Sequence, residues 1–326
     1  MHWKEIWKQN YTNLDSILSA INIKEYPPLD RNSTFRINVP RRIVQKISGP
    51  SCPLFGQFIP LREEQTENTS FSCDPLDEQS FRPTPNILYK YAKRALLLCS
   101  NACAMHCRFC FRRCFSYIRN PDLTQDLSWL ASNNQVSEVI LSGGDPLALS
   151  TPKLHSLLTA IEHMPHIQRI RFHTRFPIGI PERIDHELLS CLSSLTKPVV
   201  FVIHVNHALE LDNDVCQALQ SIHKLGIPLL SQTVLLKGVN DSYAALADLF
   251  TSLANTGIIP YYLHQLDRIQ GASHFEVAVQ VGQQLICQLQ ESLSGFMVPK
   301  YVQERPGALC KTDASFMLSI HKPCGF

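Results

Sequence analysis

Three cysteines in the spacing C-x3-C-x2-C are the residues of this sequence best suited to hold a metal cluster. Cys103, Cys107 and Cys110 follow the apolar run ALLLCSNA, and three thiols so close together cannot all pair with one another as disulfides. Thiolates are the ligands of iron–sulfur clusters, and a cubane held by three of them keeps one iron without a protein ligand. That iron is open to a chelating small molecule.

Two alternatives remain for these cysteines. Buried cysteines can be ordinary small hydrophobic residues, or they can bind structural zinc, which normally takes four ligands. Cys99 and Cys114 flank the motif and complicate the choice of ligands. We interpret both as bystanders, because they lie outside the three-cysteine spacing.

Two further motifs could do chemistry. In SGGDPL, Ser142, Gly143, Gly144 and Asp145 end an apolar run, and the glycines allow a ligand to approach the backbone closely. By itself the motif is also typical of a strand-to-helix turn. Lys311 follows a proline–glycine turn in PGALCKT, and a lysine amine can form a Schiff base with an aldehyde such as pyridoxal phosphate (PLP). Considered alone, Lys311 is an ordinary surface lysine.

Most of the chain follows a regular alternation of predicted strands and helices. From Arg94 onward, short β-branched runs alternate with helical patterns, which favours βα units around a parallel sheet. Six such units predict an α/β fold with a partial (β/α)6 barrel resembling a TIM barrel. Barrel active sites lie at the carboxyl ends of the strands. Polar residues gather at these predicted ends: Asp145, His173, His204, Asn206, Gln232 and Asp267.

Composition divides the chain and limits its function. Residues 1–88 are expected to form a mainly helical extension, 89–296 the barrel, and 297–326 a short segment that carries Lys311. A net charge of +2 without a basic stripe does not indicate nucleic-acid binding. Twelve cysteines without regular pairing favour a reducing compartment, and there is neither a signal-peptide core nor a membrane span. We therefore expect a cytoplasmic enzyme.

Taken together, the motifs resemble the radical S-adenosylmethionine (SAM) superfamily, in which SAM chelates the free iron of a [4Fe-4S] cluster. Segment by segment and in order, the chain is similar to the lysine 2,3-aminomutase family over about residues 88 to 315. The similar segments are RALLLCSNACAMHCRFCFRR, LSGGDPL, HVNH, SQTVLLKGVND, PYYLHQLD and YVQERPGALCKT. This resemblance implies a radical SAM barrel that uses the cluster, SAM and PLP.

The resemblance also implies a role for single residues. Cys103, Cys107 and Cys110 match the cluster ligands, Ser142 to Asp145 the contacts of the SAM amino group, and Lys311 the PLP lysine. The remaining matches are Tyr91 and Arg94 at the PLP ring and phosphate, Arg112 at the substrate carboxylate, Asp267 and Glu304 at the side-chain ammonium of L-lysine, and His204 and Gln232 close to SAM and PLP.

The reaction implied is a radical migration of nitrogen. Reduced cluster and SAM give a 5′-deoxyadenosyl radical that takes hydrogen from C3 of L-lysine, and the nitrogen held by PLP as an aldimine moves from C2 to C3. Cys310 beside Lys311, and Cys114 in place of a third arginine, depart from the long members of the family.

The short tail is similar to EpmB-type members, which make (R)-β-lysine for elongation factor P. A flavodoxin- or ferredoxin-like electron donor and an elongation factor P lysyl-ligase are the implied partners. An aminomutase acting on another amino acid, such as glutamate, and a non-enzymatic iron–sulfur or zinc protein are the alternatives.

Overall fold

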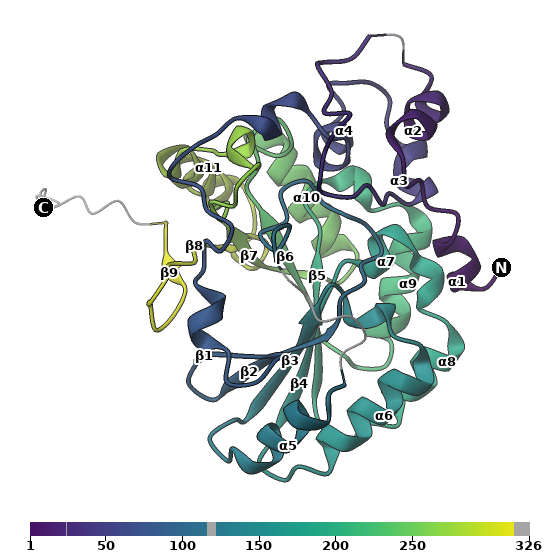
Figure 1. Ribbon diagram of the computed structural model, residues 1–326, viewed down its shortest axis with the longest axis vertical. Coiled ribbons are helices and arrows are strands. Elements are labelled where there is room, and N and C mark those ends of the chain that lie inside the picture. Colours follow the sequence, from purple (N-terminus) through teal and green to yellow (C-terminus); the bar gives the residue numbers. More distant parts are fainter. Residues whose placement is uncertain (24, 116–121, 316–326) are drawn as a thin grey trace, which may run out of the picture.

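One curved sheet organises the molecule (Figure 1). The computed structural model describes residues 1–23, 25–115 and 122–315. The sheet has nine strands in the order β1 to β9, so that strands consecutive in sequence are neighbours. Strands β2 to β8 are parallel, whereas β1 and β9 pair antiparallel at the two ends. The strands are β1 Ile87–Tyr91, β2 Arg94–Ser100, β3 Glu138–Gly143, β4 Arg169–Thr174, β5 Val199–His204, β6 Leu229–Val234, β7 Ile259–His264, β8 Lys300–Gln303 and β9 Thr312–Asp313.

A helix connects each parallel strand to the next and lies around the outside of the sheet (Figure 1). These helices are α5 Thr124–Ser132, α6 Thr151–Glu162, α8 His186–Ser193, α9 Asn213–His223, α10 Tyr243–Asn255 and α11 Val279–Ser292. In α10, Leu246, Leu249, Phe250 and Leu253 are buried, which is the three-to-four-residue spacing of a helix that packs one face on a sheet. The six βα units confirm the predicted partial barrel.

Alternation along the strands sorts side chains between the helices and the barrel interior. Phe172 of β4 and Phe201 of β5 are buried in the main core, where their rings stack at 4.5 Å between centroids. Successive side chains of a strand point to opposite faces. His173, next to Phe172, and His204, next to the core residue Ile203, therefore point toward the barrel interior.

The amino-terminal region forms short helices that pack on the barrel. They are α1 Trp3–Trp7, α2 Leu14–Ile21, α3 Arg41–Gln45 and α4 Pro53–Phe58. The rings of Trp3 and Trp7 contact the ring of Phe176, which begins the short helix α7 Phe176–Gly179 after β4. This region and the barrel share one hydrophobic core. The segment boundaries at residues 88 and 296 therefore stay a prediction.

Strand β1 and helix α5 were not predicted from the sequence. Strand β1 turns into β2 through Ala92 and Lys93, and Lys93 adopts a φ of 68° without the glycine or asparagine that usually marks such a turn. Helix α5 has no side-chain cap at its start, and it buries a carboxylate, Asp126, on the face that packs inward. Thr84 Oγ1 and Asn86 donate hydrogen bonds to Asp126, so this polar position is satisfied.

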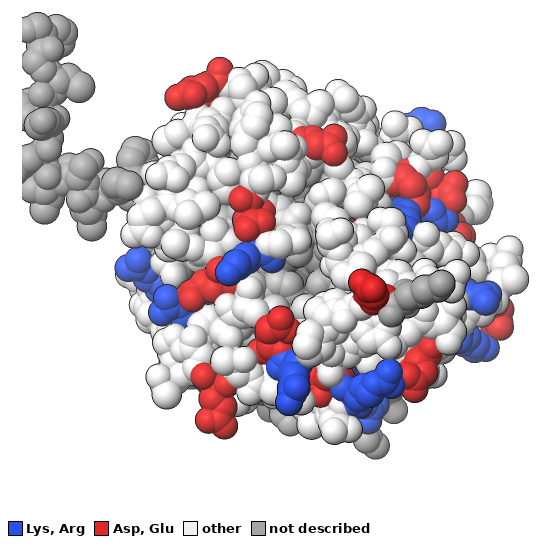
Figure 2. Space-filling view, turned by 90° about the horizontal axis from the view of Figure 1, so that it is seen from above, with Lys and Arg blue, Asp and Glu red and all other residues white. Residues whose placement is uncertain are grey.

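The surface carries charges of both signs. Figure 2 shows acidic and basic side chains interspersed among uncharged residues on one face of the molecule. Among the residues that the structure describes, none of the helices combines the length and the apolar character that a membrane span requires.

Candidate active site

The cysteine motif lies in a loop that follows β2, here called the cluster loop (residues 101–115). Burial raises the pKa of the Cys103 thiol well above its usual range, and charge on Cys110 and Cys107 raises it further. Arg175 Nη1 donates to Cys107 Sγ at 2.9 Å, although burial still raises the pKa of Cys107 to about 11. Buried neighbouring thiols become stable thiolates when they bind a cation, so this donor set fits iron.

Three cysteines on one loop are ligands of the kind that an iron–sulfur cluster takes. In the described part of the chain, no three side chains of His, Cys, Asp or Glu converge as ligands of one metal ion. In a four-iron cluster each cysteine thiolate binds a different iron, so the three sulfurs stand apart. The spacing of the motif and its placement in one loop suit that geometry.

The cluster loop is held by the amino-terminal region. Asn38 Nδ2 donates to the carbonyl oxygen of Cys103 at 3.0 Å, and the His106 amide donates to the Asn38 carbonyl at 2.8 Å. The Arg108 amide donates to the Gln57 carbonyl at 2.9 Å. Backbone groups of the cluster loop thus find partners in a region whose function the sequence does not indicate.

The two glycines after β3 are packed against the same loop. A Cβ atom on Gly143, whose φ is 117°, would lie 2.2 Å from the Ser100 carbonyl oxygen, and one on Gly144 would lie 2.4 Å from the Ala102 carbonyl oxygen. Only glycine fits such close approaches. These close contacts are with backbone atoms of the protein. The two glycines therefore position the start of the cluster loop, whether or not they also let a ligand approach.

Asp145 joins the ends of two strands. Its carboxylate accepts hydrogen bonds from Thr174 Oγ1 at 2.8 Å, from the Arg175 amide at 2.8 Å and from the Leu147 amide at 3.0 Å. Burial raises the pKa of Asp145 to about 6 against the lowering effect of these bonds. The contact of this motif with SAM stays a prediction, together with that of Ser142, whose Oγ lies 3.4 Å from Arg112 Nη1.

Lys311 points into a charged group at the ends of β1 and β8. Its Nζ donates to Glu304 Oε2 at 2.6 Å and lies 5.8 Å from the centre of the Tyr262 ring. Lys90 Nζ donates to Glu304 Oε1 at 2.9 Å, and the Tyr91 hydroxyl donates to the same oxygen. Burial would raise the pKa of Glu304, but Lys311 and the other donors lower it to about 2. Glu304 is therefore an ionised acid that binds Lys311.

The pKa of Asp267 is shifted in the opposite direction to that of Glu304. Burial raises its pKa to about 7, Lys311 opposes the shift, and the charges of Glu304 and Glu78 add to it. Among the described residues, no lysine, arginine or histidine forms an ion pair with its carboxylate. A carboxyl group in this state gains strongly from a cationic ligand.

Arg112 is buried and already holds a carboxylate. Its Nε and Nη2 donate to the two oxygens of Glu78, at 3.0 and 2.6 Å, and its Nη1 is 3.5 Å from the Gly143 carbonyl oxygen. Glu78 belongs to the segment of residues 71–81, here called the mouth segment, and no motif of the sequence indicated this pair. The predicted role of Arg112 at a substrate carboxylate has to be compatible with Glu78 beside it.

Two of the remaining predicted residues, His204 and Gln232, lie side by side on neighbouring strands of the barrel. His204 and Gln232 are register partners on β5 and β6, and Gln232 is the partner of Tyr262 on β7. The Arg94 guanidinium lies 4.8 Å from the centre of the Tyr91 ring. The structure thus brings Arg94 and Tyr91 together, and Tyr91 to Glu304 and Lys311.

Two histidines add unsatisfied polar atoms to this interior. His173 Nε2 and His264 Nε2 are buried and have no hydrogen-bond partner among the described residues. Burial lowers the pKa of both rings, and the charge of Lys311 lowers it further. His204 Nε2 lies 3.3 Å from His173 Nδ1. Orphaned nitrogens near Lys311 fit a polar cofactor or substrate in the barrel.

Arg175 is the residue that sequence reasoning missed most clearly. Besides Cys107, its guanidinium binds Gln57 Oε1 at 2.9 Å and Glu210 Oε2 at 2.6 Å. Asn206, a predicted strand-end residue, donates to the same Gln57 oxygen and so belongs to this network rather than to the barrel interior. The only signal was the position of Arg175 as the last residue of the predicted strand IQRIRFHTR.

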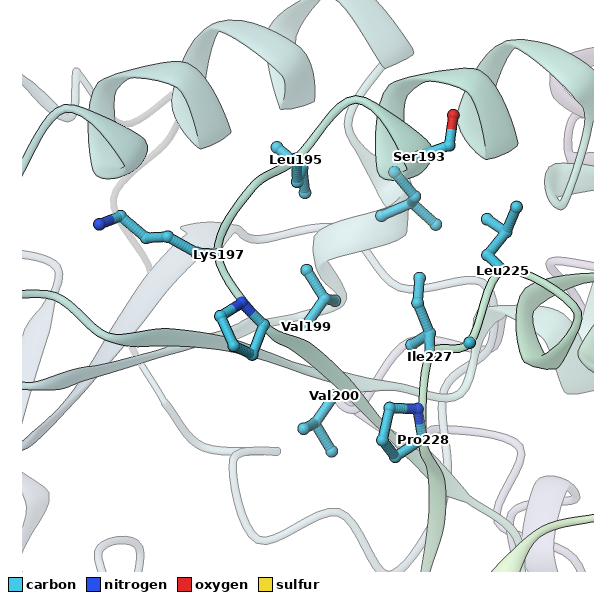
Figure 3. A pocket seen from close by; sticks show the side chains of 11 residues that line it. Ser193, Leu195, Lys197, Val199, Val200, Leu225, Ile227 and Pro228 are labelled. Atoms are coloured by element: carbon cyan, nitrogen blue, oxygen red, sulfur yellow. The ribbon is translucent and has the colours of Figure 1, made fainter.

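A separate pocket lies at the other end of the barrel. A hollow of about 390 Å³ lies at the amino-terminal ends of β5 and β6. Figure 3 shows the largely apolar side chains that line it, such as Leu195, Val199 and Ile227. The Lys197 ammonium donates to the carbonyl oxygens of Met164 and Ile167 at 3.1 and 2.6 Å. Since barrel enzymes place catalysis at the carboxyl ends, this pocket is not the candidate site.

Comparison with known proteins gives close relatives over nearly the whole chain. A Haemophilus influenzae protein named L-lysine 2,3-aminomutase is 39% identical over 320 residues, which cover 95% of each chain. An Escherichia coli protein of the same name is 38% identical and covers 94% of this chain and 92% of its own. No protein-family model matches the chain. Streptococcus suis SuiB bound to S-adenosylmethionine shares the fold over 66% of this chain and 51% of its own, with a TM-score of 0.50 at 15% identity.

Proposed function

Because the chain belongs to the L-lysine 2,3-aminomutase family, we propose that it converts L-lysine to (R)-β-lysine with a [4Fe-4S] cluster, SAM and PLP. The enzyme is an isomerase, as its family name states. The observation that carries the proposal is the meeting of Lys311, Glu304 and Asp267 at the carboxyl end of the barrel.

The side chains of this chain fit the three cofactors. Cys103, Cys107 and Cys110 would hold the cluster, and the backbone at Gly143 and Gly144 would face SAM. Lys311 would carry PLP through its amine, with Arg94 suited to the phosphate because a guanidinium pairs well with an anion. When bound, the cluster with SAM supplies a radical that abstracts hydrogen, and PLP supplies a π system for the migrating nitrogen.

The charged residues would orient L-lysine by its two ends. Asp267 would accept the side-chain ammonium, since the raised pKa of Asp267 marks a buried acid without an ion-pair partner among the described residues. Glu304 would contribute its charge next to it, and Arg112 would bind the carboxylate. Two acids at one end disfavour glutamate, whose side-chain carboxylate they would repel. Fixing both ends places C3 in one position, which is the main contribution of the protein.

The cellular role follows from the same resemblance. We propose that the (R)-β-lysine is consumed by a lysyl-ligase that modifies elongation factor P, and that a flavodoxin- or ferredoxin-like protein reduces the cluster. An oxygen-sensitive cluster and twelve cysteines suit the reducing cytoplasm.

The proposal is tested by turnover of L-lysine under anaerobic, reducing conditions with SAM. We expect chiral chromatography to show (R)-β-lysine from L-lysine and no reaction of L-glutamate. Asp267→Asn should lower kcat/KM for L-lysine at least about tenfold, which corresponds to about 1.4 kcal/mol. Asp248→Asn, an exposed acid on α10, is the matched control and should retain full activity. Equal turnover of glutamate, or full activity of Asp267→Asn, would refute the substrate assignment.

A further inference from the structure

Two exposed cysteines that the proposed reaction does not use lie together at the edge of the site. Cys73 belongs to the mouth segment and Cys114 to the end of the cluster loop, and both are exposed free thiols. Cys73 lies close enough to Cys114 to raise the pKa of the Cys114 thiol through a hydrogen bond and through its charge. The Cys73 thiol also donates a hydrogen bond to Gln270 Oε1 at 3.1 Å. The two side chains therefore form a paired dithiol on the surface.

Backbone contacts hold both cysteines on the same segment. The Ser72 amide donates to the Arg268 carbonyl at 3.0 Å, and the Gln270 amide donates to the Ser72 carbonyl at 2.9 Å. Arg113 Nη1 donates to the Gly271 carbonyl at 2.8 Å. Each cysteine thus adjoins a residue that is anchored between residues 268 and 271, so their proximity is built into the fold.

Packing beneath the pair restrains the same two segments. Phe71 of the mouth segment and Phe109 of the cluster loop belong to one small hydrophobic cluster, in which they are 7% and 8% exposed. Phe109 packs edge-to-face on Phe275 at 6.1 Å between ring centroids. Two segments fixed on a common core can bring their thiols together repeatedly without a change of fold.

Cys73 also influences the ionisation of Cys114. Burial raises the pKa of Cys114 to about 11, with contributions from the hydrogen bond and the charge of Cys73. A thiolate attacks disulfides, and an adjacent thiol resolves the mixed disulfide that results.

We propose that Cys73 and Cys114 form a site of reversible oxidation by low-molecular-weight disulfides. One cysteine of the pair loses its proton and attacks one sulfur of the small disulfide, the S–S bond of the small disulfide breaks, and one small thiolate leaves. The other cysteine then gives up its proton, attacks the sulfur of the first cysteine and releases the second small thiolate. The protein loses two electrons and two protons, and the small disulfide becomes two thiols.

The disulfide would connect two segments that meet at Arg112. The mouth segment carries Glu78, and Arg112 lies two residues before Cys114. A covalent link between Cys73 and Cys114 would keep Glu78 on the Arg112 guanidinium, where it is found at 2.6 Å. The effect on substrate entry rests on the proposed role of Arg112, whereas the disulfide itself does not depend on the proposed function.

The test uses cluster-loaded holoenzyme, incubated anaerobically with increasing ratios of oxidised to reduced glutathione. Free thiols are then alkylated and the protein is digested for peptide mass spectrometry without reduction. We expect a peptide pair linked by Cys73 and Cys114, the joint loss of two alkylation sites, their recovery with dithiothreitol, and unchanged iron content.

Matched controls separate a paired site from general thiol reactivity. Cys287, an exposed thiol on α11, should form only a mixed disulfide with glutathione. In Cys73→Ser, the internal disulfide should be absent while the iron content stays that of the wild type. The proposal is overturned if Cys73 and Cys114 are glutathionylated independently, if either links to Cys110 or Cys310, or if both remain reduced while Cys287 reacts.

Discussion

The two acids assigned to one substrate group have opposite surroundings. Glu304 is neutralised by Lys90 and Lys311, and the pKa of its carboxyl falls to about 2 although burial acts against this. Asp267 is buried beside other acids, and both its burial and their charges raise its pKa, to about 7. The different surroundings push the pKa values of the two carboxyl groups apart, which is typical of active sites. Asp267 is therefore the acid whose state responds to a cationic substrate.

The acidity of Asp267 predicts a pH dependence of lysine binding. Below about pH 7 the free enzyme carries a neutral Asp267, which attracts the substrate ammonium less than a carboxylate does. We expect kcat/KM for L-lysine to fall as pH decreases through this range, about tenfold per pH unit once Asp267 is protonated. The pH profile of Asp267→Asn should lack this limb. If the profiles of wild type and variant are parallel, Asp267 does not bind the ammonium.

Lys311 is expected to carry PLP covalently. Borohydride reduction should fix the cofactor on the peptide that contains Lys311, and Lys311→Ala should lose both this adduct and the aminomutase activity. Iron content should not change, because the cluster ligands lie on another loop. Lys300→Ala, an exposed lysine on β8, is the control and should keep the adduct. A labelled peptide elsewhere in the chain would refute the assignment.

At the scale of elements, the turn after β3 determines where the cluster loop begins. The carbonyl oxygens of Ser100 and Ala102 occupy the positions that Cβ atoms of Gly143 and Gly144 would need. The glycines therefore hold the end of β3 against the end of β2. This contact lies next to Cys103, so a small displacement of the backbone reaches the cluster ligands.

Gly144→Ala tests this packing. The added Cβ would lie 2.4 Å from the Ala102 carbonyl oxygen, and the backbone has to move to relieve the clash. We expect a loss of about 1–3 kcal/mol in the free energy of unfolding, as for other overpacked sites, together with lower iron content. A Cβ atom at Gly49 would have no other atom within 4 Å, so Gly49→Ala should change neither the free energy of unfolding nor the iron content. Wild-type iron content in both variants would show that the turn does not position the loop.

The elements of the barrel were predictable because each carries its own local signal. The β-branched run VVFVIH forms strand β5, and the helical pattern DNDVCQALQSIH forms helix α9, which Asp212 caps. The pair of Glu78 with Arg112 was not predictable, because two residues far apart in sequence meet only through tertiary packing. The same holds for Arg175 at Cys107.

At the scale of the whole molecule, the amino-terminal region supports the cluster loop through a buried charge network. Glu64 accepts hydrogen bonds from Arg108 Nε at 2.7 Å and from Arg113 Nη2 at 2.6 Å. The Glu64 side chain is only 3% exposed. The extension and the barrel are therefore joined where the loop carries its cysteines.

Removing this charge should destabilise the fold. Glu64→Gln leaves two buried guanidinium groups without their carboxylate, and breaking such a pair costs about 3–5 kcal/mol. Urea denaturation of the anaerobic holoenzyme should show this loss. Glu63→Gln, at the exposed neighbouring acid, should leave the free energy of unfolding unchanged within about 0.5 kcal/mol. Equal stability of the two variants would mean that the network does not join the two regions.

The most direct test follows hydrogen through the whole site. L-lysine carrying deuterium at C3 is incubated with the anaerobic enzyme and SAM, and both β-lysine and the nucleoside are analysed by mass spectrometry. A site that orients C3 toward SAM predicts deuterium in 5′-deoxyadenosine and SAM, and at C2 of the β-lysine formed. Formation of β-lysine without transfer of deuterium to the nucleoside, or no β-lysine from enzyme with a full cluster and PLP, would contradict the proposed function.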